Sequence, residues 1–340
     1  MNPWKMMSLS RRGRDMSKDT IVVLTRDTDY VADHLVRSME KRNIAVFRFD
    51  TFDFPLQLTL DASFKEFSWS GTLSGPQGTV ALEDIKSIWY HRPREYRIDD
   101  RLPDPYKEFA EGEAIRGFGG ILRSIDCFWV SHPDTIRAAN YKPLQLKLAH
   151  EIGFITPRTI ITNDPHALLQ FYEECERKMI CKAISNGFIA VGGDQYHAVY
   201  TSVVTSEIVQ YAENVRHTAT LFQEIIPKEL ELRVTVIGNT ALTVAIHSQH
   251  SERTRVDWRR YYPDLTYSRF SLPPDIETKC LSLVKRLNLN YGCLDLILTP
   301  VGDFVFLEIN SSGQYRWLEE ATNLPFTDTL VDILVAGSIV

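Results

Sequence analysis

The stretch CLDLILTPVGDFVFLEIN, residues 293–310, decides the fold. Two apolar runs flank a turn at Val-Gly-Asp, which predicts two strands joined by a short connection. The pairing lets Asp295 lie near Glu308 and Asn310, and these last two share a face because residues i and i+2 of a strand point the same way. Two carboxylates and an amide oxygen suit Mg²⁺, whereas facing buried carboxylates without a cation are costly. Taken alone, the same residues also fit strand-end side chains in solvent.

The composition is that of a globular protein. The 340 residues are 44% hydrophobic and 24% charged, enough for two or three packed units. A formal net charge of −6 argues against bulk nucleic-acid binding. We find no apolar run near the ~18 residues that cross a bilayer, so no membrane partner is expected.

The termini and cysteines indicate a cytoplasmic protein. Residues 1–18 are basic but lack the apolar segment of a secretory signal, and we interpret them as a disordered tail. The five cysteines are odd in number and never in CxxC spacing, so we expect reduced core thiols.

The order of expected elements predicts an α/β chain that becomes α+β in its C-terminal part. Residues 21–50 read as strand, helix and strand, which begins a parallel sheet. Further strands are expected within residues 82–93 and 126–133, giving an N-terminal α/β domain over 19–138. A helix then begins near Pro143 and ends at Gly153, and the later chain is mostly strands.

Several basic residues follow at intervals along this second part. Lys142 lies in the first turn of that helix, and Lys182 lies in the apolar strand MICKAI, where an edge position fits equally well. Glu231 and Arg233 share one face of a strand, and a guanidinium suits phosphate because its planar fork binds two oxygens. The loop AIHSQHSERTRVDWRRYY adds four arginines, for which a solvated loop is the plain alternative.

In this order, Lys142, Lys182, QEII (223–226), ELR (231–233), Asp295 and LEIN (307–310) resemble the ATP-grasp superfamily. More narrowly, the stretches NYKPLQLKLAHEIGFITPRTIITNDP, FQEIIPKELELRVTVIGN and FLEINSSGQYRWLEEATNLPFTDTLVDIL resemble the graspetide (microviridin-type) ligases, which are ATP-grasp maturases of ribosomal peptides. The leading segments FDTFDFP and IWYHRP resemble the first domain of the same group. The likeness covers residues 20–340 and implies an ATP-grasp fold behind an N-terminal pre-ATP-grasp α/β domain, with a central subdomain over 139–222 and a C-terminal subdomain over 223–340.

The resemblance implies a role for each motif residue. Lys142 and Lys182 would hold the ATP phosphates, the hinge around adenine would use the backbone of Glu224 and Ile226, and Glu231 would contact the ribose. The implied sets are nucleotide contacts at Lys142, Lys182, Gln223, Glu224, Ile225, Ile226, Glu231 and Arg233, two Mg²⁺ at Asp295, Glu308 and Asn310, and catalytic groups at Arg233, Arg259 and His247. His247 fits a packed core position as well. The chain departs from many relatives at Ser311, where they have proline after LEIN.

Three functions remain open on these residues. A peptide macrocyclase would phosphorylate Asp or Glu side chains of a precursor peptide with ATP, and Thr or Ser hydroxyls, or Lys amines, would close ester or amide rings. Its partner would be a peptide with a leader and a core rich in Thr, Asp and Glu, docked near AVYTSVVT (198–205), which also fits a plain nucleotide lid. The second function is a RimK-like amino-acid ligase, and the third is a non-catalytic protein that has kept the fold. A homodimer is left open.

Overall fold

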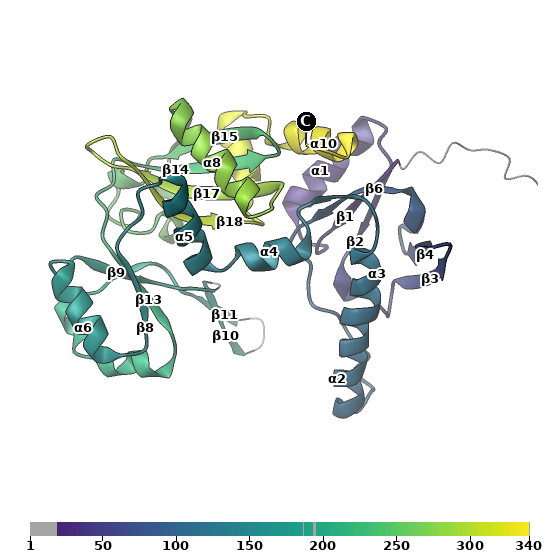
Figure 1. Cartoon of the computed structure of the whole chain (residues 1–340), viewed down its shortest axis with the longest axis horizontal. Coiled ribbons are helices and arrows are strands. Elements are labelled where there is room, and N and C mark those ends of the chain that lie inside the picture. The colour runs from purple at the N-terminus through teal and green to yellow at the C-terminus, as the bar shows by residue number, and fades with distance from the viewer. Residues whose placement is uncertain (1–18, 186, 193–194, 340) are drawn as a thin grey trace, which may run out of the picture. The chain divides into compact units, whose positions relative to one another are not determined.

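The computed structural model describes residues 19–185, 187–192 and 195–339. The expected tail, 1–18, and part of the glycine-bearing stretch 185–195 lie outside the described residues. The chain divides into two compact units, which we treat separately (Figure 1). Unit 1 comprises the residues up to Val130 together with Leu334–Ser338, and unit 2 runs from Ser131 to Ile333.

Unit 1 is built on a parallel sheet in the order β2–β1–β6–β7. The apolar run that ends at Leu24 fills the central strand, and its side chains are buried. Asp29 begins α1 by accepting hydrogen bonds from the amides of Val31 and Ala32. The strand, helix and strand expected over 21–50 are therefore confirmed. The elements are β1 (Thr20–Leu24), α1 (Tyr30–Lys41), β2 (Val46–Phe49), β6 (Ile85–Tyr90) and β7 (Phe128–Val130).

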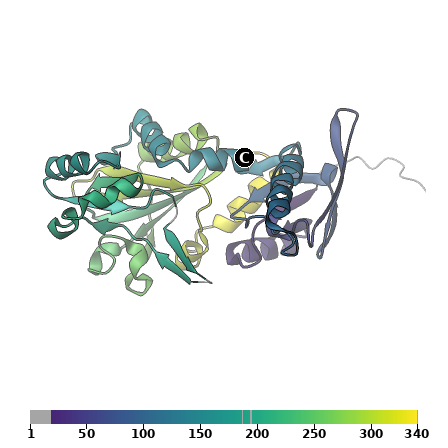
Figure 2. The same ribbon diagram turned by 90° about the horizontal axis from the view of Figure 1, so that it is seen from below.

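A small antiparallel sheet, β3–β4–β5, completes the core of unit 1 (Figure 2). Its Leu73 and Val80 pack with Leu24 and Phe118 in one cluster. The end of α10 (Phe326–Ala336) also belongs here, because Ser87 Oγ donates to the Leu334 carbonyl at 2.8 Å. The other elements are η1 (Thr51–Asp53), β3 (Thr59–Lys65), β4 (Ser68–Gly75), β5 (Gly78–Ala81), η2 (Leu82–Asp84), α2 (Asp104–Glu113), η3 (Ala114–Phe118) and α3 (Gly119–Arg123).

Unit 2 begins with helices and a four-stranded sheet in the order β12–β9–β13–β8. Helix α5 ends at Gly153, whose φ of +92° is the left-handed conformation that glycine adopts without a steric cost, as the sequence predicts. Helix α6 packs on the sheet through Leu168 and Phe171. The elements are α4 (Pro133–Ala139), α5 (Lys142–Ile152), β8 (Thr159–Thr162), α6 (Pro165–Glu174), β9 (Met179–Lys182), β10 (Phe188–Gly192), β11 (Gln195–Ala198), β12 (Ser202–Val203), α7 (Ser206–Val209), η4 (Ala212–His217) and β13 (Thr220–Glu224).

A five-stranded antiparallel sheet, β16–β15–β14–β17–β18, forms the rest of unit 2 (Figure 1). Helix α8 contacts β14, β15 and β17 and buries Cys280 and Leu283. In the described part of the chain, no helix combines the length and the apolar character that crossing a bilayer requires. The elements are β14 (Leu230–Ile237), β15 (Thr240–Ile246), η5 (Ser248–His250), η6 (Trp258–Arg260), η7 (Tyr262–Asp264), β16 (Tyr267–Arg269), α8 (Pro274–Arg286), β17 (Tyr291–Leu298), β18 (Phe304–Asn310) and α9 (Arg316–Thr322).

Candidate active site

The expected pairing of the two strands within residues 293–310 is confirmed. In β17 and β18, Asp295 lies opposite Glu308. The register then shifts, since Leu296 pairs with Phe306 and Leu307 is an extra residue in β18. An extra residue in one strand turns the side chains that follow to the other face. This bulge therefore places Glu308 on the face of Asp295, whereas Phe306 is buried on the opposite face.

Glu308 lies between two lysines from different elements. Lys142 Nζ, at the start of α5, is 2.5 Å from Glu308 Oε2, and Lys182 Nζ, at the end of β9, is 3.8 Å from the same oxygen. Burial opposes the ionised form of Glu308, but the charges of Lys182 and Lys142 outweigh it and lower the pKa of Glu308 to about 2. Burial in turn lowers the pKa of Lys182. Two ammonium groups thus share one carboxylate.

Asp295 pairs with Arg233, which lies opposite it on β14. Arg233 Nη1 is 2.8 Å from each oxygen of the Asp295 carboxylate. Burial disfavours the cationic form of Arg233, yet Asp295 raises the pKa of the guanidinium above its ordinary value. Arg233 Nε is buried without a hydrogen-bond partner among the described residues. This guanidinium therefore has donors left for a further anion.

The loop after β18 closes on Arg233 at a glycine. A Cβ on Gly313 would lie 2.6 Å from Arg233 Nη2 and 2.6 Å from Cys293 Sγ, so only glycine fits without a shift of its neighbours. The Tyr291 hydroxyl donates to the Gly313 carbonyl and holds the loop in this position. The sequence analysis did not select Gly313, because no periodicity or motif separates it from an ordinary turn glycine.

Glu231 lies on the same strand as Arg233, two residues earlier. Its Oε1 accepts hydrogen bonds from Lys228 Nζ at 3.1 Å and Ser248 Oγ at 2.8 Å. Burial raises the pKa of Glu231, although the Lys228 charge opposes this. Lys228 was not predicted as a site residue, but its position three residues before Glu231 was a signal that could have found it.

Arg259 is oriented by Asp257. Its Nη2 is 2.6 Å from Asp257 Oδ2, which also accepts the Thr201 amide at 2.9 Å. The hydrogen bonds that Arg259 donates to Asp257 raise the pKa of Arg259, and the charges of Glu308 and Asp295 act in the same direction. The four arginines of this loop are all exposed, as a solvated loop requires, and the charge of Arg259 nevertheless acts on both carboxylates.

The QEII segment begins at the end of β13. Gln223 is 1% exposed, its Nε2 donates to Thr159 Oγ1 at 2.9 Å, and its Oε1 is buried without a partner among the described residues. The Glu224 carboxylate accepts from the amide and Nε of Arg158, at 2.7 and 2.8 Å. The Glu224 side chain is therefore engaged, and the expected adenine contact through its backbone stays a prediction. Two further residues follow the strand, exposed Ile225 and half-buried Ile226.

Two predicted site residues have other partners. Asn310 is exposed, lies on the Glu308 face by register, and accepts the Ser312 amide on Oδ1 at 3.0 Å. His247 follows β15, and its Nε2 is 2.9 Å from Ser268 Oγ, so the structure does not bring it to the carboxylates. Within the described residues, no group of three or more His, Cys, Asp or Glu side chains gathers around a metal position. The donor set at β17 and β18 is two carboxylates and one amide oxygen, which suits Mg²⁺ when phosphates and water supply the other ligands.

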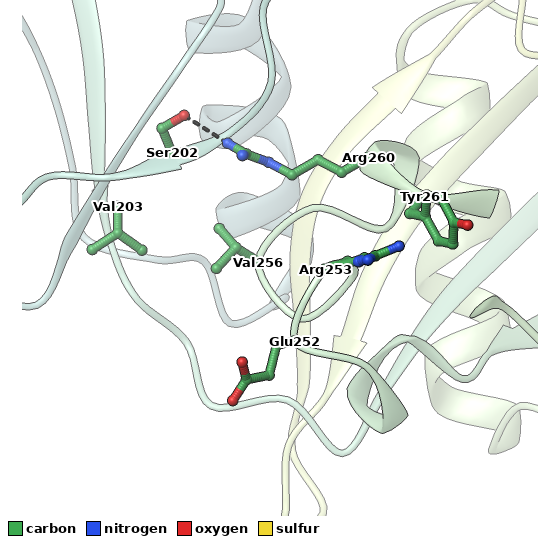
Figure 3. A pocket seen from close by; sticks show the side chains of 7 residues that line it. All are labelled: Ser202, Val203, Glu252, Arg253, Val256, Arg260 and Tyr261. Carbon is green, nitrogen blue, oxygen red and sulfur yellow. Dashed lines mark hydrogen bonds between the residues drawn. The ribbon is translucent and has the colours of Figure 1, made fainter. Parts of the chain in front are cut away.

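A pocket of about 650 Å³ lies beside the arginine-bearing loop (Figure 3). Arg260 spans it and donates to Ser202 Oγ and the Thr201 carbonyl, each at 2.8 Å. The Arg253 guanidinium lies 4.7 Å from the centre of the Tyr261 ring. The lining residues are Ser202, Val203, Glu252, Arg253, Val256, Arg260 and Tyr261.

Comparison with known proteins places this geometry in a family. The family described as the MvdD pre-ATP grasp domain matches residues 20–137. The macrocyclase MdnC from Microcystis aeruginosa MRC, solved with the precursor peptide MdnA, is 30% identical, with a TM-score of 0.81 over 93% of this chain and 99% of MdnC. The chain belongs to the ATP-grasp macrocyclases, the RiPP-associated ATP-grasp ligases.

Two further structures resemble this ATP-grasp ligase over nearly its whole length. The RiPP-associated ATP-grasp ligase of Chryseobacterium gregarium, solved with ADP and a leader and core peptide, is 30% identical, with a TM-score of 0.85 over 94% of this chain and 97% of that one. The macrocyclase MdnB from Microcystis aeruginosa MRC is 29% identical, with a TM-score of 0.77 over 94% of this chain and 100% of that one. None of the curated proteins matches the chain. The expected ATP-grasp fold with a pre-ATP-grasp domain is confirmed.

Proposed function

We propose that this ATP-grasp ligase forms rings in a ribosomal precursor peptide. ATP phosphorylates an Asp or Glu side chain of the peptide, and a Thr or Ser hydroxyl, or a Lys amine, then attacks the acyl phosphate and releases phosphate. The observation that carries the proposal is the set of Lys142, Lys182, Arg233, Asp295 and Glu308 on one face of the β17–β18 sheet. Relatives solved with a precursor peptide and with ADP support the same substrates.

The cations of the site explain how it would handle phosphates. In the structure, Lys142 and Lys182 neutralise Glu308, and Arg233 neutralises Asp295. With nucleotide bound, the two ammonium groups would turn to the ATP phosphates, while Arg233 and Arg259 would stabilise the charge that develops as the phosphoryl group moves. The residues that would meet the nucleoside are Gln223, Glu224, Ile225, Ile226 and Glu231.

Once the lysines and arginines contact the nucleotide, the carboxylates of Asp295 and Glu308 would need another positive charge beside them. Asp295, Glu308 and Asn310 fit two Mg²⁺ ions, because they supply hard oxygen donors and leave positions for phosphate oxygens. The ions would neutralise the terminal phosphates of the nucleotide. The subdomains over residues 139–222 and 223–340 are part of the proposal, with the nucleotide between them. His247 would lie outside the phosphate contacts.

We place the docking of the leader at β12 and the pocket beside it. β12 is an edge strand, so its outer backbone groups can pair with an added peptide strand. Ser202 and Val203 of this strand line the pocket of Figure 3 together with the apolar Val256. A Val256→Glu variant should weaken the binding of a fluorescent leader peptide at least about tenfold by anisotropy. Unchanged affinity would favour the plain nucleotide lid instead.

The reaction is tested with a candidate precursor peptide, a short Thr-, Asp- and Glu-rich sequence sought among the neighbouring reading frames. Incubation with ATP and Mg²⁺ should form ADP and remove 18 Da, one water, for each ring closed. An intact peptide mass together with ADP formation on a free amino acid would favour the RimK-like alternative, and no ADP with any substrate would favour a non-catalytic role. The cytoplasmic location and the homodimer stay predictions, the second to be decided by sedimentation.

A further inference from the structure

In unit 1, two loops meet at the carboxyl ends of neighbouring parallel strands. β1 has β2 on one side and β6 on the other, so the strand order reverses between β1 and β6. In open α/β sheets, ligands bind outside the carboxyl ends of the strands at such a switch point. The two loops here are residues 25–29 after β1 and 91–94 after β6. The residues proposed to contact the nucleotide all belong to unit 2.

The switch point holds a buried acid and histidine in contact. His91 is 1% exposed, its Nδ1 is 2.7 Å from Asp29 Oδ2, and its ring stacks on Trp89 with centroids 4.4 Å apart. Burial opposes ionisation of Asp29, but hydrogen bonds from His91 and Thr25 outweigh it and lower the pKa of Asp29 to about 2. Because Asp29 is ionised, Nδ1 bears the proton of their hydrogen bond. His91 Nε2 is left buried without a partner among the described residues, which is costly for a polar atom.

Two arginines of the same loops lack a carboxylate partner. Arg26 Nε is buried and has no hydrogen-bond partner among the described residues. Arg92 follows His91 with a φ of +56°, a conformation that costs energy for a residue other than glycine. Arg92 is exposed at the surface, and desolvation by the surrounding chain and the charge of Arg26 lower its pKa against the opposing charge of Asp29. The two guanidinium groups therefore repel each other.

Other arginines of unit 1 do have carboxylate partners. Arg48 is 2.5 Å from Asp33, and Arg94 is 2.6 Å from Asp50. Within the described residues, no such ion pair is formed by Arg26 or Arg92. Of the two acids in these loops, Asp27 contacts Arg94 at 3.3 Å, and Asp29 already accepts from His91, Thr25 and the start of α1. Arg26 and Arg92 therefore carry positive charge that a bound anion could neutralise.

We propose that the switch point of unit 1 binds a side-chain carboxylate, an Asp or Glu of the peptide substrate, through Arg26, Arg92 and Nε2 of His91. A carboxylate accepts from guanidinium forks in pairs of hydrogen bonds and also accepts from Nε2 once the ring bears both protons. Asp29 acts as a positioning residue, because it fixes which edge of the imidazole faces the ligand. That the carboxylate belongs to a peptide rests on the proposed function.

The test uses the full chain labelled with ¹³C and ¹⁵N at histidine, without nucleotide. His91→Gln assigns the His91 signals. Titration with N-acetylglutamate should shift them saturably, whereas the neutral N-acetylglutamine should not. Arg26→Gln and Arg92→Gln should each weaken binding at least about tenfold. The matched control is Arg101→Gln, an exposed arginine of the same unit, which should leave the affinity unchanged.

Inorganic phosphate serves as the second anion. Shifts with phosphate but none with N-acetylglutamate would overturn the assignment to an acidic side chain, and shifts with neither would overturn the site itself. Equal affinity for N-acetylglutamate in wild type, Arg26→Gln and Arg92→Gln would also overturn the site. The titration contains no ATP. If it shows no binding while the enzyme still forms rings, only this inference is overturned. Normal binding without ADP formation overturns the proposed function instead.

Discussion

At the scale of single residues, the Glu308 carboxylate neutralises the charges of Lys142 and Lys182. It lies within 4 Å of two ammonium groups and keeps a pKa of about 2, so it is ionised at neutral pH. Replacing it by glutamine retains its size and removes the charge that both the lysines and a divalent cation would need. We expect Glu308→Gln to lower ADP formation at least about 100-fold.

The matched control for this variant is Asp303→Asn. Asp303 is an exposed acid on the turn that joins the same two strands. Its substitution should leave ADP formation within about twofold of wild type, because exposed charges contribute little. If Glu308→Gln and Asp303→Asn turn over ATP equally well, Glu308 has no role in holding the metal or orienting the lysines.

A second residue-scale prediction concerns Gly313. A methyl group there would meet Arg233 Nη2 and Cys293 Sγ at 2.6 Å, so Gly313→Ala must displace the guanidinium or the loop. We expect the variant to lose about 1–3 kcal/mol of unfolding free energy in urea and to lower kcat more than the KM for ATP. Gly120→Ala is the control, because nothing lies within 4 Å of its Cβ. A Gly313→Ala enzyme with wild-type kcat would show that the loop does not position Arg233.

At the scale of elements, the sequence determines what is local. The helix over Lys142–Ile152 ends at the predicted glycine, and the strands of residues 21–24 and 46–49 lie where alternating and β-branched residues place them. The bulge at Leu307 could not be predicted, because alternation from Phe306 onward would put Glu308 on the opposite face. The hydrogen bonds of Glu224 with Arg158 also join residues 66 positions apart, beyond the reach of any local pattern.

The start of α1 gives an element-scale prediction. Asparagine can cap the helix as aspartate does, so Asp29→Asn removes the charge facing His91 and keeps the cap. The folded pKa of Asp29, about 2, is below its ordinary value of 3.8, so its stabilisation is present above pH 3.8 and is lost as the pH falls towards 2. We expect Asp29→Asn to lower the free energy of unfolding by about 2 kcal/mol at pH 7 and by roughly half as much at pH 3.

Urea unfolding at the two pH values measures this difference. Asp27→Asn is the control in the same loop, since Asp27 is exposed and its contact with Arg94 is 3.3 Å long. It should change the unfolding free energy by less than about 0.5 kcal/mol. A deficit of Asp29→Asn that stays constant from pH 7 to pH 3 would mean that the charge of Asp29 is not what stabilises the start of the helix.

At the scale of the whole molecule, the chain returns to its first unit at its end. The Leu334–Ser338 segment belongs to unit 1, where the Leu334 carbonyl accepts from Ser87, 247 positions earlier. The N-terminal segments FDTFDFP and IWYHRP resemble the family, but no periodicity shows that the end of the last helix, from Leu334, belongs with their unit. Contacts of this range follow from the topology of the fold rather than from local propensity.

Nucleotide binding should stabilise the two units unequally. A ligand that binds only the folded state adds about 2.7 kcal/mol at a hundredfold excess over its Kd. We expect a non-hydrolysable ATP analogue with Mg²⁺ to slow hydrogen exchange in β17, β18 and residues 223–226, and to raise the Tm. Lys182→Ala should lose most of this gain, because the half-buried Lys182 lies 3.8 Å from Glu308. Lys147→Ala should keep it, because Lys147 is an exposed lysine on the helix of Lys142. Protection confined to unit 1, or equal gains in both variants, would mean that the nucleotide binds elsewhere.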